Sequence, residues 1–346
     1  MKTYELGLIV GKFYPFHKGH EYLINTGLAH CDSLVVMVVS NRRLERISAE
    51  TRAGWISETF PELDVRVIYD IGHDDDSKKW ADYTVELLGR APDAVFTSET
   101  YGATWAKELG CKHVQVDLPR STFPISGTMV RSDPLHHWDM LPAATKRYFA
   151  QRVVLIGAES TGKSTLAEML AKHYKTNWTH EYGRFYTELR RHNDTSSGNA
   201  QKGITLAWQE HDFVNIARTQ SLIEDQLAET ANKILTCDTD SFATHIWHYR
   251  YTKRWSNQVR EIAKLSKPLM YLVTPPDIPF TQDGTRDGEH IRKEMHTWVV
   301  GALRKAGKPY HIVSGGGDVQ ARLDDAIKAI DSAQAKWIKT KGWANQ

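Results

Sequence analysis

Residues 151–170 read QRVVLIGAESTGKSTLAEML, and this stretch decides the fold of the C-terminal half. An apolar run at 153–156 predicts a buried strand, and apolar residues recur with helical spacing from residue 163 onward. Between them lies the pattern G-x-x-x-x-G-K-[ST], which requires a strand before it and a helix after it. We therefore predict a P-loop domain that binds phosphates at the start of this helix.

The loop between strand and helix has the chemistry of a nucleoside triphosphate site. Its backbone N–H groups can wrap phosphate oxygens, and the helix N-terminus adds positive potential. Lys163 is expected to act in catalysis by reaching the β- and γ-phosphates, while Ser164 holds Mg²⁺. The residues expected to bind ATP are Gly157, Glu159, Ser160, Thr161, Gly162, Lys163, Ser164 and Thr165.

A phosphoryl transferase also needs a carboxylate at a strand end, to hold the metal or to orient the acceptor hydroxyl. Asp238 and Asp240 follow an apolar strand at 234–237, and we assign Asp238 to catalysis and metal binding and Asp240 to substrate binding. Glu181 is a second candidate for catalysis and substrate binding, with Arg184 as a substrate-binding neighbour. An ion pair between Glu181 and Arg184 is the alternative role for these two residues.

The charged stretch 282–293, QDGTRDGEHIRK, contains glycines and follows a proline turn. Loops of this kind can close over a reacting phosphoryl group and exclude water. Arg286 and Arg292 are therefore candidate catalytic residues, and a mobile surface loop is the alternative interpretation.

The N-terminal half contains a second turn with phosphate-binding chemistry. Residues 11–20 read GKFYPFHKGH after an apolar strand at 6–10. His17 and His20 are three residues apart, so both imidazoles lie on one face of the following helix and can donate to a triphosphate. Glycine lets a ligand approach the backbone closely, and we expect Gly11, Lys12 and Phe13 to bind the nucleotide.

Residues 125–131, ISGTMVR, supply hydroxyl groups at an expected helix start, with Arg131 one turn into the helix. Ser126, Gly127 and Thr128 are expected to bind the nucleotide, and Arg131 is expected to act in catalysis. With the first turn, this segment completes the pattern of nucleotidylyltransferases, which join a nucleoside triphosphate to a phosphate and release pyrophosphate. Because the acceptor phosphate is already a nucleophile, such a site works by positioning and charge stabilisation, and it needs no catalytic base.

Both halves show strands that alternate with helices, which is typical of an α/β fold with parallel sheets. A length of 346 residues also favours two domains. We predict a Rossmann-like nucleotidyltransferase domain at 1–147 and a P-loop kinase domain at 148–346. Expected strands lie at 6–10, 33–39, 65–69, 94–97, 153–156, 234–237, 269–273 and 310–313, and the later expected helices lie at 204–230 and 319–335.

The composition excludes several functional classes. With 44 Lys and Arg against 42 Asp and Glu, the net charge is +2, so we expect no nucleic-acid partner. The apolar runs are far shorter than the roughly 20 residues that cross a bilayer, so we expect no membrane insertion. The N-terminus lacks the features of a signal peptide, and three widely spaced cysteines suit reduced thiols, so we expect a cytoplasmic protein.

The order of four segments, GKFYPFHKGH, VFTSETYG, FPISGTMVR and GAESTGKST, resembles the bifunctional NadR family. This family combines a nicotinamide-nucleotide adenylyltransferase with a ribosylnicotinamide kinase. The resemblance implies that the C-terminal site phosphorylates nicotinamide riboside to nicotinamide mononucleotide (NMN) and that the N-terminal site adenylylates NMN to NAD, with Mg-ATP used at both. It also implies that Trp80 lies near the nicotinamide, although a tryptophan with helical spacing is equally typical of a core.

The resemblance further implies small-molecule partners, a homo-oligomer and functional coupling to a nicotinamide riboside transporter. Some family members begin with a helix-turn-helix domain, whereas here the first strand begins within a few residues, so we expect no operator binding. Gly127 stands where many single-function adenylyltransferases have a second serine. Two alternatives stay open: another nucleoside kinase fused to a different adenylyltransferase, or a nucleotide-sensing regulator.

Overall fold

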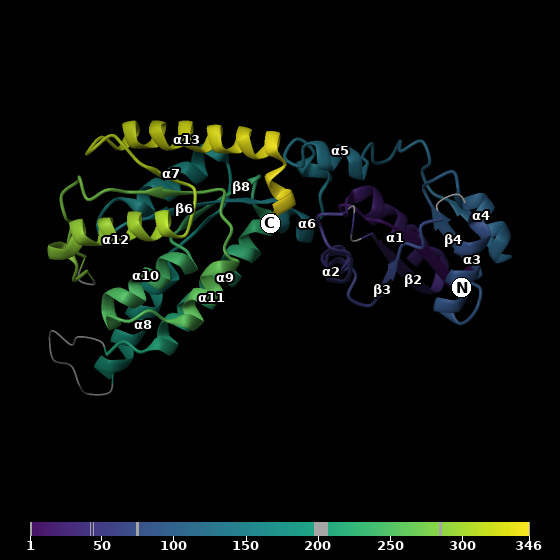
Figure 1. Cartoon of the computed structure of the whole chain (residues 1–346), viewed down its shortest axis with the longest axis horizontal. Helices are drawn as coiled ribbons and strands as arrows, with labels where there is room; N and C mark the ends of the chain where they lie inside the picture. Colours follow the sequence, from purple (N-terminus) through teal and green to yellow (C-terminus); the bar gives the residue numbers. More distant parts are fainter. Residues whose placement is uncertain are drawn as a thin grey trace. The chain divides into compact units, whose positions relative to one another are not determined.

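The computed structural model describes residues 2–41, 43, 45–73, 76–196, 207–283 and 286–345. The chain divides into two compact units, Met1–Phe149 and Ala150–Ala344 (Figure 1). Each unit contains a five-stranded sheet whose strand pairs are all parallel. The predicted α/β class with two parallel sheets is therefore confirmed.

The sheet of the N-terminal unit has the strand order β3-β2-β1-β4-β5. Its strands are β1 (Tyr4–Gly11), β2 (Cys31–Ser40), β3 (Asp64–Tyr69), β4 (Ala94–Thr97) and β5 (Lys112–Gln115). Its helices are α1 (Lys18–His30), α2 (Ala49–Thr59), α3 (Ser77–Leu88), α4 (Gly102–Leu109), α5 (Gly127–Ser132), η1 (Trp138–Met140) and α6 (Ala143–Phe149). The chain order reverses between β1 and β4, and ligands of open α/β sheets bind beyond the carboxyl ends of the strands at such a point.

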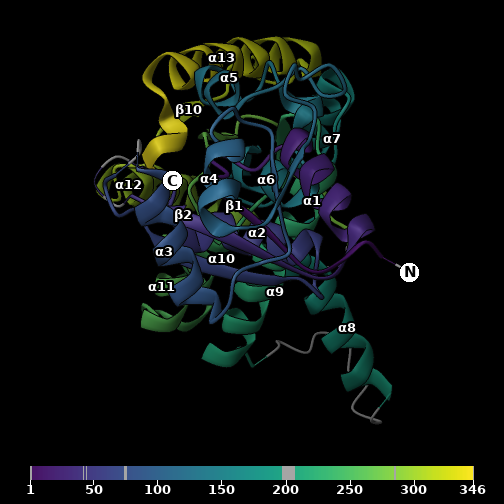
Figure 2. The ribbon, with the colours of Figure 1, turned by 90° about the vertical axis from the view of Figure 1, so that its right-hand side faces the viewer.

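The central strands are apolar because helices cover both faces of a parallel sheet. One core cluster combines Leu8, Met37 and Val95 of the strands with Trp105 of α4 and Ala81 of α3. The helices α3 and α4 lie side by side over this cluster (Figure 2). Through Leu8, this cluster includes the strand that precedes the first turn.

The C-terminal unit has the strand order β10-β9-β6-β8-β7. Its strands are β6 (Gln151–Ile156), β7 (Trp178–Thr179), β8 (Ile234–Asp238), β9 (Met270–Val273) and β10 (Tyr310–Ile312). Its helices are α7 (Lys163–Tyr174), α8 (Tyr182–Ser196), α9 (Glu210–Thr230), α10 (Ser241–Thr252), α11 (Asn257–Leu265), η2 (Glu289–Ile291), α12 (Arg292–Lys305), α13 (Val319–Thr340) and η3 (Gly342–Asn345). In Figure 1, α7 and α13 lie on one side of β6 and β8, while α9, α10 and α11 lie on the other.

Several expected elements differ in their bounds from the structure, and the helix expected at 319–335 continues to Thr340. The helix expected at 204–230 begins only at Glu210, because Gln209 and Asp212 form a capping box that fixes the helix start; residues 204–206 lie outside the described residues. The strand expected from 153 begins at Gln151, where its backbone N–H bonds to Lys233. Among the described residues, no helix is both long and apolar enough to cross a membrane.

Candidate functional site

The turn from β6 to α7 forms a loop whose backbone curls around a central point. Ser160 and Gly162 have left-handed φ angles of 54° and 81°, the conformation that directs successive N–H groups to one side of a loop. Gly157 packs so closely against β9 that an added Cβ would lie 2.5 Å from the Thr274 hydroxyl. The Thr161 hydroxyl donates to the Ala158 carbonyl at 2.9 Å, which fixes the loop internally.

Lys163 and Ser164 open α7 on the inner side of this loop. The Lys163 ammonium is buried and donates to the Ala158 carbonyl at 2.9 Å, within the loop that would hold phosphates. The Ser164 hydroxyl donates to Asp238 Oδ2. Asp238 Oδ1 is buried without a hydrogen-bond partner, which marks a place for an added ligand. Hydroxyl and carboxylate oxygens are ligands that suit Mg²⁺, so these two residues fit the predicted metal.

A pocket extends from this loop into the unit. It is lined by Glu159, Ser160, Thr161, Gly162, Lys163, Ser164, Thr165, Glu181, Gly183, Arg184, Thr187, Trp208, Phe213, Ile216, Gln220, Thr239, Thr244, Trp247, Tyr251 and Arg286. The polar end therefore contains most of the predicted ATP-binding residues, together with Glu181, Arg184 and Arg286. The other end is formed by aromatic side chains of α9, α10 and the segment before α9.

Two carboxyl groups near Lys163 have raised pKa values. Burial raises the pKa of Glu181 to about 7, with a further contribution from the charge of Asp238, while Lys163 opposes the shift. Burial also raises the pKa of Asp238, against Lys163 and the Ser164 hydrogen bond. A carboxyl that titrates near neutrality is suited to accept a proton from a substrate hydroxyl.

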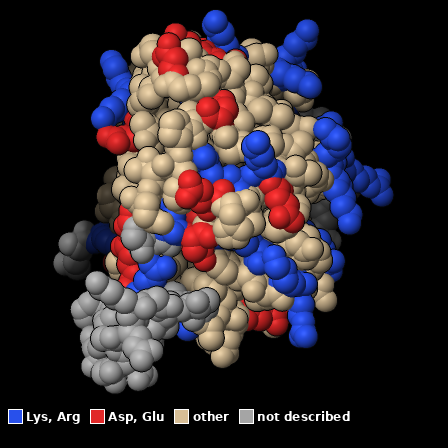
Figure 3. Space-filling view, turned by 90° about the vertical axis from the view of Figure 1, so that its left-hand side faces the viewer, with Lys and Arg blue, Asp and Glu red and all other residues tan. Residues whose placement is uncertain are grey.

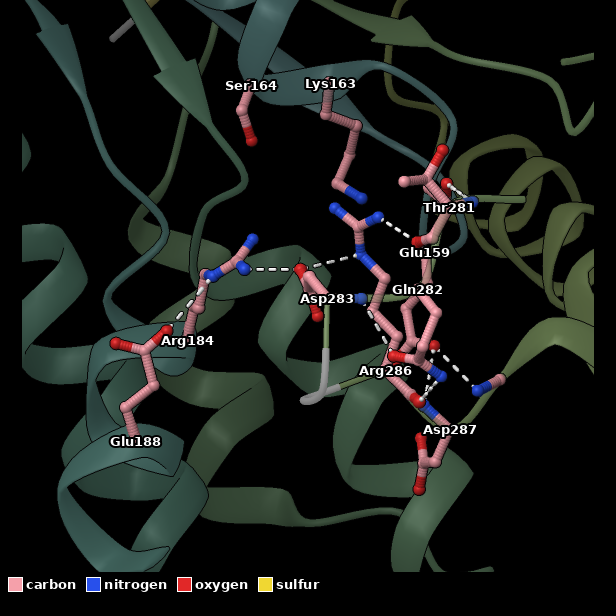
Figure 4. Close-up of polar contacts among 12 residues, drawn as sticks. Glu159, Lys163, Ser164, Arg184, Glu188, Thr281, Gln282, Asp283, Arg286 and Asp287 are labelled. Carbon is pink, nitrogen blue, oxygen red and sulfur yellow. Dashed lines mark hydrogen bonds and ion pairs between the residues drawn. The ribbon is translucent and has the colours of Figure 1, made fainter. Parts of the chain in front are cut away.

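Asp283 lies between two arginines at the mouth of the pocket (Figure 4). Arg184 donates to Asp283, and the Arg286 Nε lies 3.1 Å from the same carboxylate oxygen. Arg184 also forms an ion pair with Glu188 at 3.3 Å. Its backbone N–H donates to the Glu181 carbonyl at 3.2 Å, and its positive charge acts to lower the pKa of the Glu181 carboxyl. Two guanidinium groups that converge on one anionic oxygen form an arrangement that also suits a phosphoryl group.

Two predicted residues of the C-terminal unit lie away from this pocket. Asp240 is fully buried, caps α10 at the Ala243 N–H, and accepts hydrogen bonds from Tyr271 at 2.8 Å and Ser266 at 3.0 Å. These contacts occupy its carboxylate, and Asp240 does not line the pocket. Arg292 is also buried and contacts the back of the loop, so it does not reach over the pocket. Within the stretch 282–293, residues 284 and 285 lie outside the described residues.

The aromatic end of the pocket was not predicted from the sequence. Trp247 and Tyr251 are four residues apart on α10, and the Arg250 guanidinium lies 4.9 and 4.7 Å from their ring centres. Arg250 also donates to Glu159 at 2.8 Å and pairs with Asp287. The one signal in the sequence is the aromatic spacing in 247–251, which is equally typical of a core helix.

The opposite signs of charge alternate on the molecular face that Figure 3 shows. Acidic and basic side chains lie next to one another there, as expected from the balanced composition. Phosphate recognition in this unit therefore depends on individual residues such as Lys163 and not on a broad basic surface.

In the N-terminal unit, His17 and His20 form a stacked pair at the start of α1. Their ring centres are 3.6 Å apart, and His17 Nδ1 accepts the backbone N–H of His20 at 3.4 Å. Burial, aided by the charge of Arg120, lowers the pKa of His17 to about 3. Burial, aided by the neighbouring His17 and Arg120, lowers the pKa of His20 well below its usual value. Both rings are therefore neutral at pH 7, and the accepting Nδ1 of His17 leaves its Nε2–H as the donor.

Tyr14 links the two predicted motifs of this unit. Its carbonyl accepts a hydrogen bond from Arg131, and the guanidinium groups of Arg131 and Arg52 lie 4.8 and 5.3 Å from its ring centre. Arg131 also donates to the Thr128 hydroxyl at 3.0 Å. An added Cβ at Gly127 would lie only 2.4 Å from the Tyr14 carbonyl oxygen, which explains why this position holds a glycine and not the serine of many single-function adenylyltransferases.

The remaining predicted residues of this unit lie on the same turn or beside the core. Ser126 caps α5 by accepting the Met129 N–H at 3.2 Å, as expected for a helix start. The Lys12 carbonyl accepts from buried Arg52, and Phe13 takes a left-handed φ of 46° beside Gly11. Trp80 packs against the core cluster of α3 and α4 and donates to the His73 carbonyl at 3.1 Å. Asp74 and Asp75, in the acidic run before it, lie outside the described residues.

Arg52 was not predicted, although it organises the first turn. It is fully buried and donates to the carbonyls of Lys12, Val39, Ile47 and Ser48, and it pairs with Glu45. An arginine in a helix usually lies in solvent, so no sequence pattern distinguished it.

Comparison with known proteins finds similarity in both halves of the chain. Residues 6–74 match the family described as citrate lyase ligase C-terminal domain, and residues 152–322 match the family described as AAA domain. Two curated proteins, from Escherichia coli (strain K12) and Salmonella typhimurium (strain LT2), are called trifunctional NAD biosynthesis/regulator protein NadR. Each is 29% identical over 324 residues, covering 87% of this chain and 76% of the relative. The chain is similar to these NadR proteins over most of its length.

Solved structures agree with this NadR-like fold. A crystal structure described as NadR protein in complex with NR matches with a TM-score of 0.74 and 21% identity, covering 97% of each chain. A second, described as NadR protein in complex with NAD and AMP-PNP, matches with a TM-score of 0.71 and 20% identity, again covering 97% of each chain. At these sequence identities the likeness shows the fold alone.

Proposed function

We propose that this chain is a bifunctional transferase of NAD salvage. The predicted P-loop domain, residues 148–346, phosphorylates nicotinamide riboside with ATP to give NMN and ADP. The predicted N-terminal domain, residues 1–147, joins NMN to the adenylyl group of a second ATP and gives NAD and pyrophosphate. The relatives named for NAD biosynthesis, and the NadR structures described with NR and with NAD and AMP-PNP, support these substrates.

One observation carries the proposal: a single pocket joins the phosphate-binding loop to an aromatic end. Lys163 and Ser164 line the polar end, and Trp208, Trp247 and Tyr251 line the other. Aromatic faces attract a flat cation such as a pyridinium ring. A nucleoside with a cationic base would thus place its ribose between the rings and the transferred phosphoryl group.

In the phosphoryl transfer, Glu181 accepts the proton of the riboside hydroxyl as the oxygen attacks the γ-phosphorus. Its raised pKa places this carboxyl near neutrality, where a base is effective. Lys163, Arg184 and Arg286 stabilise charge on the phosphoryl oxygens, and the Asp283 carboxylate must leave the two arginines for the phosphate to bind. Ser164 and Asp238 would hold Mg²⁺, which neutralises phosphate charge when bound.

In the adenylyl transfer, an NMN phosphate oxygen attacks the α-phosphorus of ATP and pyrophosphate leaves. The neutral His17 and His20 donate hydrogen bonds to phosphate oxygens, and His20 Nδ1, buried without a partner, has a free position for such a bond. Arg131 and the hydroxyls of Ser126 and Thr128 stabilise the developing charge at the start of α5.

The test is to incubate the purified chain with nicotinamide riboside and Mg-ATP and to follow NMN, NAD and pyrophosphate over time. Lys163→Ala should abolish NMN formation while leaving NAD formation from added NMN intact. His20→Ala should let NMN accumulate without NAD. If Lys163→Ala also stopped NAD formation from NMN, the assignment of two separate sites would be wrong, and turnover of a different nucleoside in preference to the riboside would favour the alternative kinase.

Cytoplasmic location, a homo-oligomer, the absence of a nucleic-acid partner and coupling to a riboside transporter remain predictions that follow from the sequence and from the family resemblance.

A further inference from the structure

Two arginines from distant parts of the sequence contact the outer side of the phosphate-binding loop. Arg292, the first residue of α12, donates from Nη2 to the Ser160 carbonyl at 2.8 Å. Arg322, in the first turns of α13, donates from Nη2 to the Thr161 carbonyl at 3.0 Å. Both arginines are buried, and neither lines the pocket. The backbone carbonyls of two successive loop residues thus each accept a hydrogen bond from an arginine on the side of the loop opposite the pocket.

These contacts determine where the loop N–H groups point. In a trans peptide the carbonyl and the following N–H point in opposite directions. When the carbonyls of Ser160 and Thr161 face outward to the arginines, the N–H groups of Thr161 and Gly162 face inward to the pocket. These are backbone donors that a loop of this kind offers to phosphate oxygens.

Each arginine is itself fixed by further carbonyl and carboxylate groups. Arg292 donates to the Ile278 carbonyl at 3.0 Å. Arg322 donates to the Gly316 carbonyl at 3.3 Å and pairs with Asp277 at 3.3 Å. The donors of a guanidinium group are fixed in one plane, so the side chain loses little conformational entropy for each hydrogen bond that it forms. The two side chains therefore act as fixed supports for the loop.

We propose that Arg292 and Arg322 are positioning residues that set the affinity of the P-loop site for ATP. They do so by holding the Ser160 and Thr161 carbonyls outward, without touching the nucleotide. The inference deepens the proposed kinase function and rests on it. It also gives Arg292 a different role from the closure over the phosphoryl group that its sequence position had suggested.

The test uses Arg292→Met and Arg322→Met in the full chain, since methionine keeps an aliphatic stem but donates no hydrogen bond. Each variant should raise the KM for ATP in riboside phosphorylation on the order of tenfold, the size expected for one hydrogen bond from a charged donor. The KM for the riboside and the rate of NAD formation from NMN should stay unchanged. Arg304→Met, which alters an exposed arginine of the same helix α12, is the matched control and should change neither KM.

A direct binding measurement separates this inference from the kinase assignment. Calorimetric titrations of the parent chain and of Lys163→Ala with ATP are compared, and the binding that the variant lacks is assigned to the P-loop site. Arg292→Met should weaken this binding about tenfold, even if riboside proves not to be the acceptor. If Arg322→Met fails to fold, as judged by thermal unfolding, Arg292→Met decides alone. An unchanged affinity for ATP in folded Arg292→Met overturns the inference, and so does an equal rise in the KM values for ATP and riboside, which would mean a general loosening of the unit.

Discussion

Replacing Glu181 by glutamine should remove kinase activity and at the same time stabilise the folded chain. Burial and the charge of Asp238 raise the pKa of Glu181 from 4.5 to about 7. The ionised carboxylate is therefore less favourable in the folded chain than in the unfolded chain. Each pKa unit corresponds to about 1.4 kcal/mol, so the difference reaches about 3 kcal/mol. Glutamine has the same shape and carries no charge.

The sign of the effect depends on pH. The folded-state pKa lies above that of the unfolded chain, so the destabilisation is absent below about pH 4.5, grows between pH 4.5 and 7, and is constant above that range. Glu181→Gln should therefore raise the free energy of unfolding by about 2 to 3 kcal/mol at pH 8.5 and by less than about 1 kcal/mol at pH 5.0. Removing a general base should lower the rate of riboside phosphorylation by a factor of about 10² to 10⁴.

Denaturant unfolding followed by circular dichroism at both pH values, together with the riboside assay, measures these effects. Glu294→Gln, at an exposed position of α12, is the matched control and should change stability by less than about 0.5 kcal/mol at either pH. A Glu181→Gln variant no more stable than the parent at pH 8.5 would refute the reasoning from burial. A variant that phosphorylates riboside at the parent rate would remove Glu181 from the proton transfer.

Three further substitutions test other parts of the structure. Gly127→Ser places a Cβ 2.4 Å from the Tyr14 carbonyl, so NAD formation from NMN should fall at least about tenfold while riboside phosphorylation is unaffected, as separate assays of the two steps would show. Arg52→Met removes the buried cation that pairs with Glu45 and donates to four backbone carbonyls, and it should destabilise the N-terminal unit by about 3 to 5 kcal/mol in thermal or denaturant unfolding. Trp247→Ala removes an aromatic surface of the pocket and should raise the KM for riboside about tenfold or more with little change in the KM for ATP.

The sequence predicted the parts of the fold that local physics controls. The strands β1, β2, β6 and β8 each contain a largely apolar run, and each of the two phosphate-binding turns follows such a run. The edge strands β5, reading KHVQ, and β7, reading WT, were not predicted because they are short and carry little apolar periodicity. Their pairing depends on neighbouring strands that are distant in sequence.

The candidate sites followed the same division. The loop residues from Gly157 to Thr165 were predictable because a contiguous motif fixes their geometry. Asp238 faces Ser164, whereas Asp240 caps α10 and does not line the pocket, because the left-handed φ of 68° at Thr239 turns the chain away from strand geometry between the two residues. The roles of Arg292 and Arg322 depend on two helices that pack behind the loop, an arrangement that no local spacing encodes.

The two sites offer different chemistry to the same kind of ligand. Both bind phosphates at the start of a helix after a strand, yet the first site presents histidines whose lowered pKa values keep them neutral, whereas the second contains a carboxyl that titrates near pH 7. Lowering the pH from 8 to 6 therefore protonates Glu181 and should slow the phosphorylation of riboside. The protonation state of the two histidines that serve the adenylyl transfer does not change in this range. Because the first reaction supplies the substrate of the second, acidification should limit NAD formation at the P-loop site, and added NMN should bypass that limit.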